Sequence, residues 1–138
     1  MSDIEPTGRA TVLVCITCRT AALAQAGADS AAPEPPRAGL LLADATAAAA
    51  ANASDISVQR IRCLGNCSRG LSAAIRCDNA WTYVFGGLDA SRDGLALIAG
   101  ARLLAGAADG IMPWQGRPEP LKRGLIARIP PRNFQESP

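Results

Sequence analysis

The chain has 138 residues, a formal net charge of +2, 49% hydrophobic residues and 4% aromatic residues, which suits one domain with a core of small side chains. The sequence contains no histidine, which excludes a Ser-His-Asp triad, a histidine general base, a zinc finger with histidine ligands and a Rieske centre. The small charge, with no aromatic residues interleaved among basic ones, argues against a nucleic-acid binder.

The N-terminal part of the chain predicts one strand followed by irregular structure. Residues 1–9 are a polar lead-in, and the apolar, β-branched run at 10–14 predicts a buried strand that ends at Cys15. Residues 19–37 are rich in alanine and proline. A weak helical turn is expected at 21–26, and the prolines that follow end any regular element.

The middle of the chain predicts a helix and three strands. Alanine and leucine favour a helix from about 37 to 52. Alternation of apolar and polar residues predicts a half-exposed strand at 56–62, which leads into the loop CLGNCSRG. Residues 72–77 and 81–85 are typical of a β-hairpin.

The last predicted helix runs from residue 89 or 91 to about 107. Helical spacing predicts an inward face formed by Leu95, Ile98 and either Leu103 or Leu104. Residues 112–138 contain six prolines, which make regular structure there unexpected. Five basic residues between 117 and 132 make this C-terminal arm basic, and we assign no chemistry to it.

The predicted order is strand–helix–strand, a cysteine loop, then strand–strand–helix. A parallel βαβ unit followed by an antiparallel ββα unit is the minimal thioredoxin-like α/β fold, here with a mixed four-stranded sheet. We expect residues 10–111 to form this domain. Residues 1–9 lead into it, and residues 112–138 form an irregular, Pro-rich arm.

We expect a cytoplasmic protein with neither a secretory signal nor a membrane span. The first residues lack a basic region followed by an apolar one, and the longest apolar stretches are interrupted by Asp44 and Arg102. Thiols stay reduced in the cytoplasm, so the five cysteines are interpreted as ligands or redox groups rather than disulfides.

Four cysteines form two close pairs, Cys15-x2-Cys18 and Cys63-x3-Cys67. One pair follows the first predicted strand and the other precedes the third, so the two loops should meet at one side of the sheet. Four thiolates repel one another, and a bound metal neutralises them. The candidates are a structural zinc ion, a 2Fe–2S cluster or a 4Fe–4S cluster, with buried thiols or a bare dithiol as alternatives. Cys77 is interpreted as a structural thiol.

A thioredoxin-type thiol oxidoreductase, working through Cys15 and Cys18, is a further alternative. Two features argue against it. The proline cluster at 33–36 delays the helix that normally opens at such a motif, and residues 68–71 lack the cis-proline that normally precedes the third strand. A four-cysteine zinc site in a metal-handling protein is the other alternative, which Cys-x2-Cys fits better than Cys-x3-Cys.

Glycines and arginines surround the cysteines. Gly65 and Gly70 offer the second loop positive-φ freedom, and loop N–H groups can donate to cluster sulfurs. Arginines 19, 60, 62 and 69 lie close to cysteines; they could offset cluster charge and dock an acidic partner, or form a solvated face. No paired carboxylates and no Gly-rich phosphate loop are evident, so we expect no catalytic residues and no enzyme.

Several motifs together resemble a bacterial family of small, predicted metal-binding cysteine proteins related to the thioredoxin-like 2Fe–2S ferredoxins. They run from Val12 to Pro131 and comprise VLVC-x-x-C, CLGNCSRG, WTYVFGGLD, DG-x-x-PW, RP and RG-x-IARIPP. The resemblance implies a 2Fe–2S cluster and a one-electron carrier. By position Cys15, Cys63 and Cys67 match ligands, and Cys18 is the fourth, after a shorter spacer than those ferredoxins usually have.

The resemblance also implies partners and a setting. The partners would be a reductase and an electron acceptor, and thioredoxin-like ferredoxins are commonly homodimers. The predicted metal-binding branch is associated with cobalamin biosynthesis, so a cobalamin-related or other metallocofactor pathway is the expected setting. Neither nucleic acid nor membrane is expected as a partner.

Overall fold

The computed structural model describes residues 10–17, 37–132 and 134, with Cys67 described by its backbone. In chain order the elements are β1 (Ala10–Cys15), α2 (Ala38–Ala49), β2 (Ile56–Ile61), the 3-10 helix η1 (Cys67–Arg69), β3 (Ala73–Cys77), β4 (Thr82–Phe85), α3 (Asp93–Ala105), α4 (Glu119–Arg123) and β5 (Leu125–Ile129). The predicted strands and the two long helices are thus present. None of the helices in these described ranges has the length and hydrophobicity needed to span a membrane.

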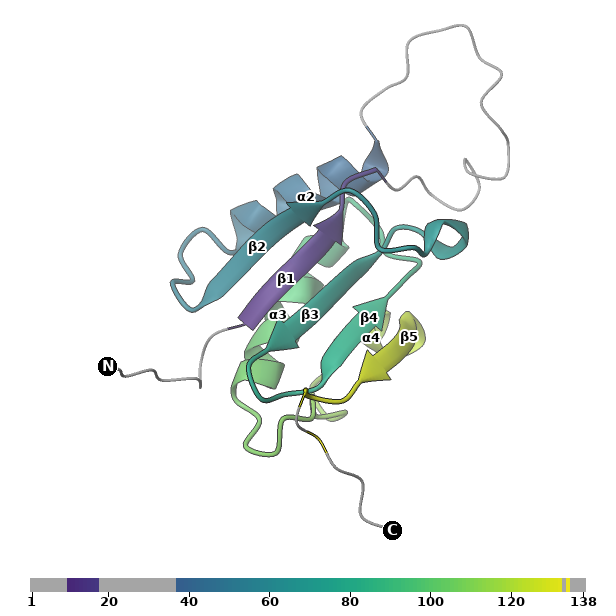
Figure 1. Cartoon of the computed structure of the whole chain (residues 1–138). Helices are drawn as coiled ribbons and strands as arrows, with labels where there is room; N and C mark the ends of the chain where they lie inside the picture. Colours follow the sequence, from purple (N-terminus) through teal and green to yellow (C-terminus); the bar gives the residue numbers. More distant parts are fainter. Residues whose placement is uncertain (1–9, 18–36, 133, 135–138) are drawn as a thin grey trace, which may run out of the picture.

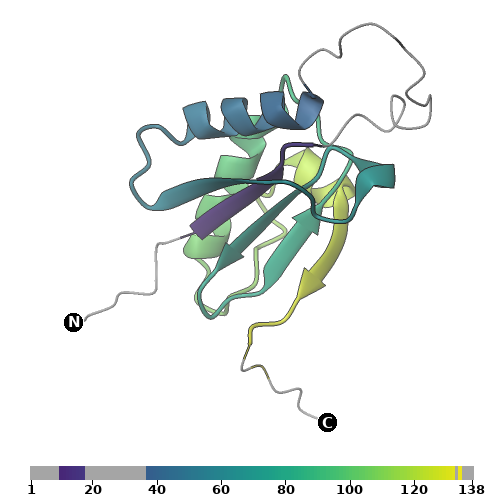
Figure 2. The ribbon, with the colours of Figure 1, turned by 45° about the horizontal axis from the view of Figure 1, so that its top comes forward.

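The strands form one mixed sheet in the order β2-β1-β3-β4-β5 (Figure 1). β1 and β2 are parallel, and the other neighbours are antiparallel. Helices α2 and α3 pack on one another and on the same face of the sheet (Figures 1 and 2). The carboxyl ends of β1 and β2 therefore lie at the same end of the sheet as the start of β3 and the end of β4.

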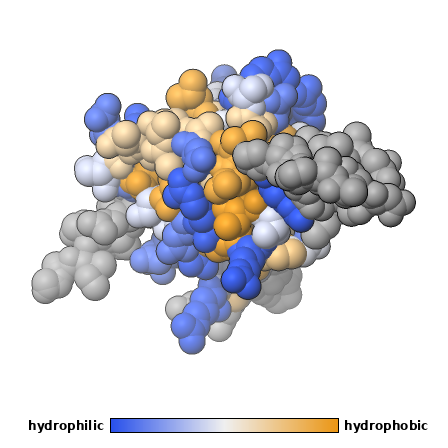
Figure 3. All heavy atoms as spheres, turned by 90° about the horizontal axis from the view of Figure 1, so that it is seen from above, coloured by the Kyte–Doolittle hydropathy of each residue, from blue (hydrophilic) through white to orange (hydrophobic). Residues whose placement is uncertain are grey.

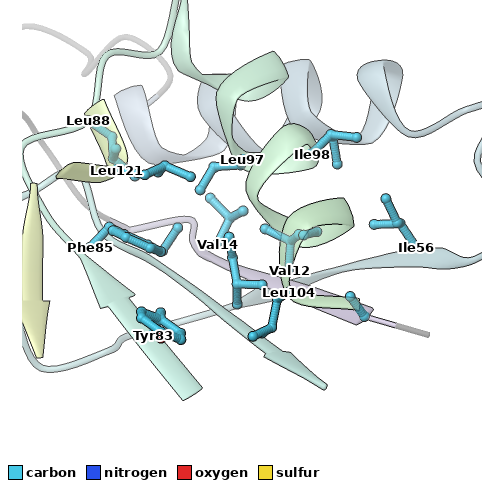
Figure 4. Packing of buried hydrophobic residues seen from close by; sticks show 14 of the residues in the cluster. Val12, Val14, Ile56, Tyr83, Phe85, Leu88, Leu97, Ile98, Leu104 and Leu121 are labelled. Carbon is cyan, nitrogen blue, oxygen red and sulfur yellow. The ribbon is translucent and has the colours of Figure 1, made fainter. Parts of the chain in front are cut away.

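The core lies between the sheet and these two helices (Figure 4). Alternate residues of the strands, such as Val12 and Val14, are fully buried there, as the period of a strand requires. The two helices approach closely at Gly94, where a Cβ atom would lie 3.0 Å from the backbone of Thr46. Small residues at this contact compensate for the few aromatic residues in the core.

The C-terminal region differs from the prediction. Residues 119–129 form α4 and the edge strand β5, so the sheet has five strands rather than four and the arm is not irregular. The prolines are placed where regular elements tolerate them. Pro120 lies in the first turn of α4, and Pro130 and Pro131 follow the end of β5. The fully buried Leu121 anchors α4 to the core.

The inward face of α3 was predicted in part. Ile98 and Leu104 are buried, but Leu95 is 72% exposed, and Leu97 and Ala101 take its place in the core. This helix is apolar on most of its circumference, so spacing alone does not select the buried face.

Other hydrophobic residues besides Leu95 are also exposed at the surface. Seen from above, they gather in the middle of the molecule with hydrophilic residues around them (Figure 3).

Arginine contributes to the packing of the segment between α3 and α4. Arg117 is buried, and its guanidinium lies 5.5 Å from the ring centre of Tyr83 and 5.1 Å from that of Trp114. It donates hydrogen bonds to the carbonyl oxygens of Met112 and Pro113, at 2.5 and 3.2 Å. The basic C-terminal region therefore includes a charge that is part of the interior, which its composition did not indicate.

Candidate functional site

Cys15 is the last residue of β1, where the parallel register pairs it with Ile61 of β2. The backbone N–H of Cys15 donates to the carbonyl oxygen of Ser72, at 3.1 Å, which ties it to the residue before β3. Cys15 is 1% exposed. Because parallel strands end together, the segments that follow β1 and β2 emerge side by side. We call residues 15–17, 62–72 and 86–87 the cysteine end of the sheet.

The Cys15 thiol lies against the second cysteine loop. Its Sγ donates a hydrogen bond to the carbonyl oxygen of Arg62, at 3.4 Å, and lies 3.8 Å from the hydroxyl oxygen of Thr17. The Thr17 hydroxyl donates to the same Arg62 carbonyl. Arg62 directly precedes Cys63, so the structure brings the end of β1 to within one residue of the second cysteine pair.

Cys63 is exposed, unlike Cys15. Its Sγ accepts a hydrogen bond from the backbone N–H of Gly65, at 3.2 Å. Gly65 has a φ of +75°, so the predicted use of its conformational freedom is confirmed. Gly70 does not have a positive φ, contrary to prediction, and the peptide bond between Gly70 and Leu71 is cis. The Gly65 N–H thus ties the Cys63 sulfur to the backbone of its own loop.

The backbone around Cys67 is anchored on both sides. The side-chain amide of Asn66 donates to the Ser72 hydroxyl, at 3.0 Å. The main-chain carbonyl oxygen of Asn66 accepts from the Arg69 N–H, also at 3.0 Å. The Arg69 carbonyl in turn accepts from the N–H of Gly87, at 2.7 Å. These bonds hold the loop against the start of β3 and the end of β4. The Asn in CLGNCSRG is thus a positioning residue that motif reading did not single out.

The structure describes the four predicted ligands to different extents. Cys15 and Cys63 reach the same end of the sheet, Cys67 is described there by its backbone, and Cys18 lies outside the described residues. Within residues 10–17, 37–132 and 134, no three cysteine or acidic side chains form a group that could hold a metal ion. The set Cys15, Cys18, Cys63 and Cys67 therefore stays a prediction. The helical turn expected at 21–26 also lies outside the described residues and stays a prediction.

Cys77 lies away from these cysteines. It is half-buried and pairs in register with Ala10, the first residue of β1, at the opposite end of the sheet. A thiol at that position cannot reach the segments that follow β1 and β2. Its distance from them agrees with its interpretation as a structural residue.

Of the four arginines predicted near the cysteines, Arg19 lies outside the described residues, and the other three divide into two groups. Arg60 forms an ion pair with Asp44 of α2, at 2.8 Å, and so contributes to helix–sheet contact rather than to the cysteine end. Arg62 and Arg69 belong to the cysteine end and form no ion pair within the described part of the chain. Arg37 donates to the carbonyl oxygen of Thr17, at 2.9 Å. It supports the first cysteine loop, and no sequence signal distinguished it.

This arrangement is a thioredoxin-like α/β fold with cysteines gathered at one end of the sheet. A solved thioredoxin-like 2Fe–2S ferredoxin from Aquifex aeolicus is similar, with a TM-score of 0.54 and 16% identity over 91% of this chain and 98% of that one. At this identity the likeness establishes the fold, which confirms the predicted fold class apart from the number of strands.

The chain belongs to the family described as "Protein of unknown function (DUF1636)", whose model matches residues 12–131. That range includes all five cysteines as well as α4 and β5. None of the curated proteins matches the chain.

Proposed function

We propose that this protein is a one-electron carrier that binds a 2Fe–2S cluster through Cys15, Cys18, Cys63 and Cys67. One observation carries the proposal: the Cys15 thiol is hydrogen-bonded to the carbonyl oxygen of Arg62, next to Cys63. One cysteine of each pair, Cys15 and Cys63, therefore lies at the same end of a fold that is also found in a 2Fe–2S ferredoxin. Reductase and acceptor proteins would supply and take the electron.

The chemistry of the residues at this end fits such a cluster. Thiolates are the usual ligands of iron–sulfur clusters, and histidine is absent from the chain. When bound, the cluster would supply a centre that takes up and releases one electron. The Gly65 N–H donates to the Cys63 sulfur, and hydrogen bonds of this kind raise the reduction potential. The Arg62 and Arg69 guanidiniums offset the negative charge of four thiolates.

Burial differs between the two sides of the proposed centre. Cys15 is enclosed by β1, β2 and the segment before β3, which keeps water from that side. Cys63 faces solvent. We infer that electrons enter and leave on the side of the second cysteine loop, where a partner can approach.

The decisive test is the metal and sulfide content of protein purified without oxygen. We expect two iron ions and two acid-labile sulfides per chain, with visible absorption bands that bleach on addition of dithionite. One zinc ion without sulfide would overturn the proposal and favour a metal-handling protein. A colourless, metal-free protein that reduces insulin disulfides would overturn it in favour of a thiol oxidoreductase.

A matched pair of variants assigns the ligands. Cys63→Ser is expected to abolish the visible bands and the bound iron, because it removes one thiolate. Cys77→Ser makes the same chemical change at the opposite end of the sheet and should retain both. Cys18→Ser tests the fourth ligand. Iron and sulfide that persist in Cys18→Ser would show that another group completes the set.

A further inference from the structure

A groove of about 860 Å³ adjoins the second cysteine loop. Its walls come from the start of α2, from Arg69 of η1, from residues 86–93 after β4 and from residues 119–124 around α4. Figure 2 shows α4 and η1 at the same end of the sheet. The volume falls within the range of about 300–1,000 Å³ that is usual for ligand sites, so the groove can admit several side chains of a partner.

Some charged side chains of the groove wall are paired with other groups of the same wall. The Asp89 carboxylate accepts hydrogen bonds from the N–H and the hydroxyl of Ser91, at 2.7 and 2.6 Å, and lies 3.8 Å from the Arg92 guanidinium. Asp93 is buried in the first turn of α3, where the helix dipole favours a carboxylate, and it accepts the N–H of Asp89 at 2.7 Å. Asp93 is thus structural, whereas Asp89 stays partly exposed and charged in the groove wall beside Arg92.

The remaining charges of the groove are Arg69, Arg123 and Glu119. Both arginines are exposed, and neither has an ion pair with any residue that the structure describes. Three arginines and three carboxylates line the groove in all, and Arg69 and Arg123 are its exposed cations without an ion pair among the described residues. Guanidinium groups bind carboxylates through paired hydrogen bonds, which gives orientation as well as attraction.

Main-chain contacts hold the two arginine-bearing segments in place. The N–H of Gly87 donates to the carbonyl of Arg69, and the N–H of Gly86 donates to that of Gly124, at 2.7 and 2.8 Å. A Cβ atom on Gly86 would lie 2.6 Å from the Arg69 carbonyl oxygen, so no side chain fits between the segments. The groove is thus preformed and is continuous with the loop that carries Cys67.

We propose that this groove is the docking site for an electron-transfer partner, and that the partner presents an acidic segment to Arg69 and Arg123. The proposal rests on the electron-carrier function above. Docking here places the partner against Arg69 of η1, two residues after Cys67. Charge complementarity at such a contact sets the rate of encounter and the choice of partner, and Glu119 opposes an acidic segment.

A labelled hexaglutamate peptide serves as the probe, with binding followed by fluorescence anisotropy at low and high salt. Arg69→Gln and Arg123→Gln should each weaken binding by about tenfold, and the double variant should abolish it. Glu119→Gln should tighten binding. Arg102→Gln, an equal charge change in the last turn of α3 and outside the groove, is the control and should bind as the parent does.

A kinetic measurement on the reduced protein gives a second readout. Oxidation by the anion ferricyanide should slow in Arg69→Gln and Arg123→Gln but not in Arg102→Gln, and oxidation by the cation hexaammineruthenium(III) should not slow in any of them. Equal effects of all three variants in both assays would overturn the docking site, since only net charge would matter. Peptide binding does not require a cluster, so a protein without iron that still binds through Arg69 and Arg123 would overturn the electron-carrier function alone.

Discussion

The cysteine end of the sheet and the aromatic residues near the C-terminal region use arginine in opposite ways. Arg117 lies over Tyr83 and Trp114, and Arg128 lies 4.3 Å from the ring centre of Trp81. Trp81 also meets Phe134 edge to face, at 5.3 Å between ring centres. Cation–π and ring contacts of this kind add stability.

At the cysteine end, arginines have no such partners. Arg62 and Arg69 have neither an aromatic ring nor a carboxylate beside them among the residues described. The loop is held instead by main-chain contacts and by the Asn66–Ser72 hydrogen bond. One region thus uses positive charge for stability, and the other leaves it available to a cluster or a partner. Substitutions in the two regions should therefore have separable effects on stability and on the cysteine site.

The largest effect is expected from Gly86→Ala. Its Cβ atom would lie 2.6 Å from the Arg69 carbonyl oxygen and 2.8 Å from the Asn66 amide nitrogen, so the second cysteine loop must move. We expect a loss of about 2–4 kcal/mol in the free energy of unfolding and loss of most bound iron. Denaturant unfolding and iron analysis measure the two quantities.

Gly106→Ala is the control for this change. It ends α3 with a φ of −88°, and its added Cβ atom would meet only the Arg102 carbonyl oxygen, at an ordinary 3.4 Å. It should keep both stability and iron. Full iron content in Gly86→Ala would show that the loop does not depend on this close contact.

Arg117→Met should affect stability alone. The variant keeps an apolar side chain but loses two hydrogen bonds to main-chain carbonyls and two cation–π contacts. We expect a loss of about 2–3 kcal/mol by denaturant unfolding, with an unchanged visible spectrum. Arg117→Lys retains the charge but lacks the paired N–H donors of a guanidinium, so its free energy of unfolding should lie between those of the parent and Arg117→Met. A changed spectrum without a change in stability would contradict the separation of the two regions.

Ser72→Ala should loosen the cysteine loop without unfolding the protein. Ser72 is fully buried, and its hydroxyl accepts the Asn66 amide, which would lose this partner. We expect about 1–2 kcal/mol of destabilisation and a shifted reduction potential. Thr46→Val removes a buried hydroxyl that bonds the Leu42 carbonyl within α2, and it should destabilise without shifting the potential. Equal potentials in both variants would contradict a role for Ser72 in the site.

The smallest effect concerns the groove wall and depends on pH. Hydrogen bonds from Ser91 lower the pKa of Asp89 below its ordinary value of 3.8. A lowered pKa in the folded state means that this carboxylate stabilises the fold above pH 3.8 and loses its contribution as pH falls through the folded-state pKa. Asp89→Asn should therefore unfold at a slightly lower temperature than the parent at pH 7, and the difference should vanish in acid. A difference that persists at pH 2 would contradict this assignment.

Sequence patterns were most informative where a local period or a spacing decides the structure. The β-branched run at 10–14 predicted β1, which is buried along almost its whole length, and the alternation at 56–62 predicted β2, because a half-exposed strand imposes that period. The order of the elements then brought Cys15 and Cys63 to one end. The buried face of α3 was predicted less well, since Leu95 and Leu97 both lie on apolar stripes and only the approach of α2 and the sheet selects one.

Composition alone thus determined that histidine chemistry is excluded, and order and spacing predicted a thioredoxin-like fold with Cys15 and Cys63 at one end of the sheet. Only the tertiary structure decided that residues 125–129 extend the sheet, that Arg117 is buried, and that Arg69 and Arg123 share a groove. The physical reason is the range of the interactions. Periodicity and turn preference act over a few residues, whereas an edge strand, a buried guanidinium and a groove depend on segments that meet only after the core has formed.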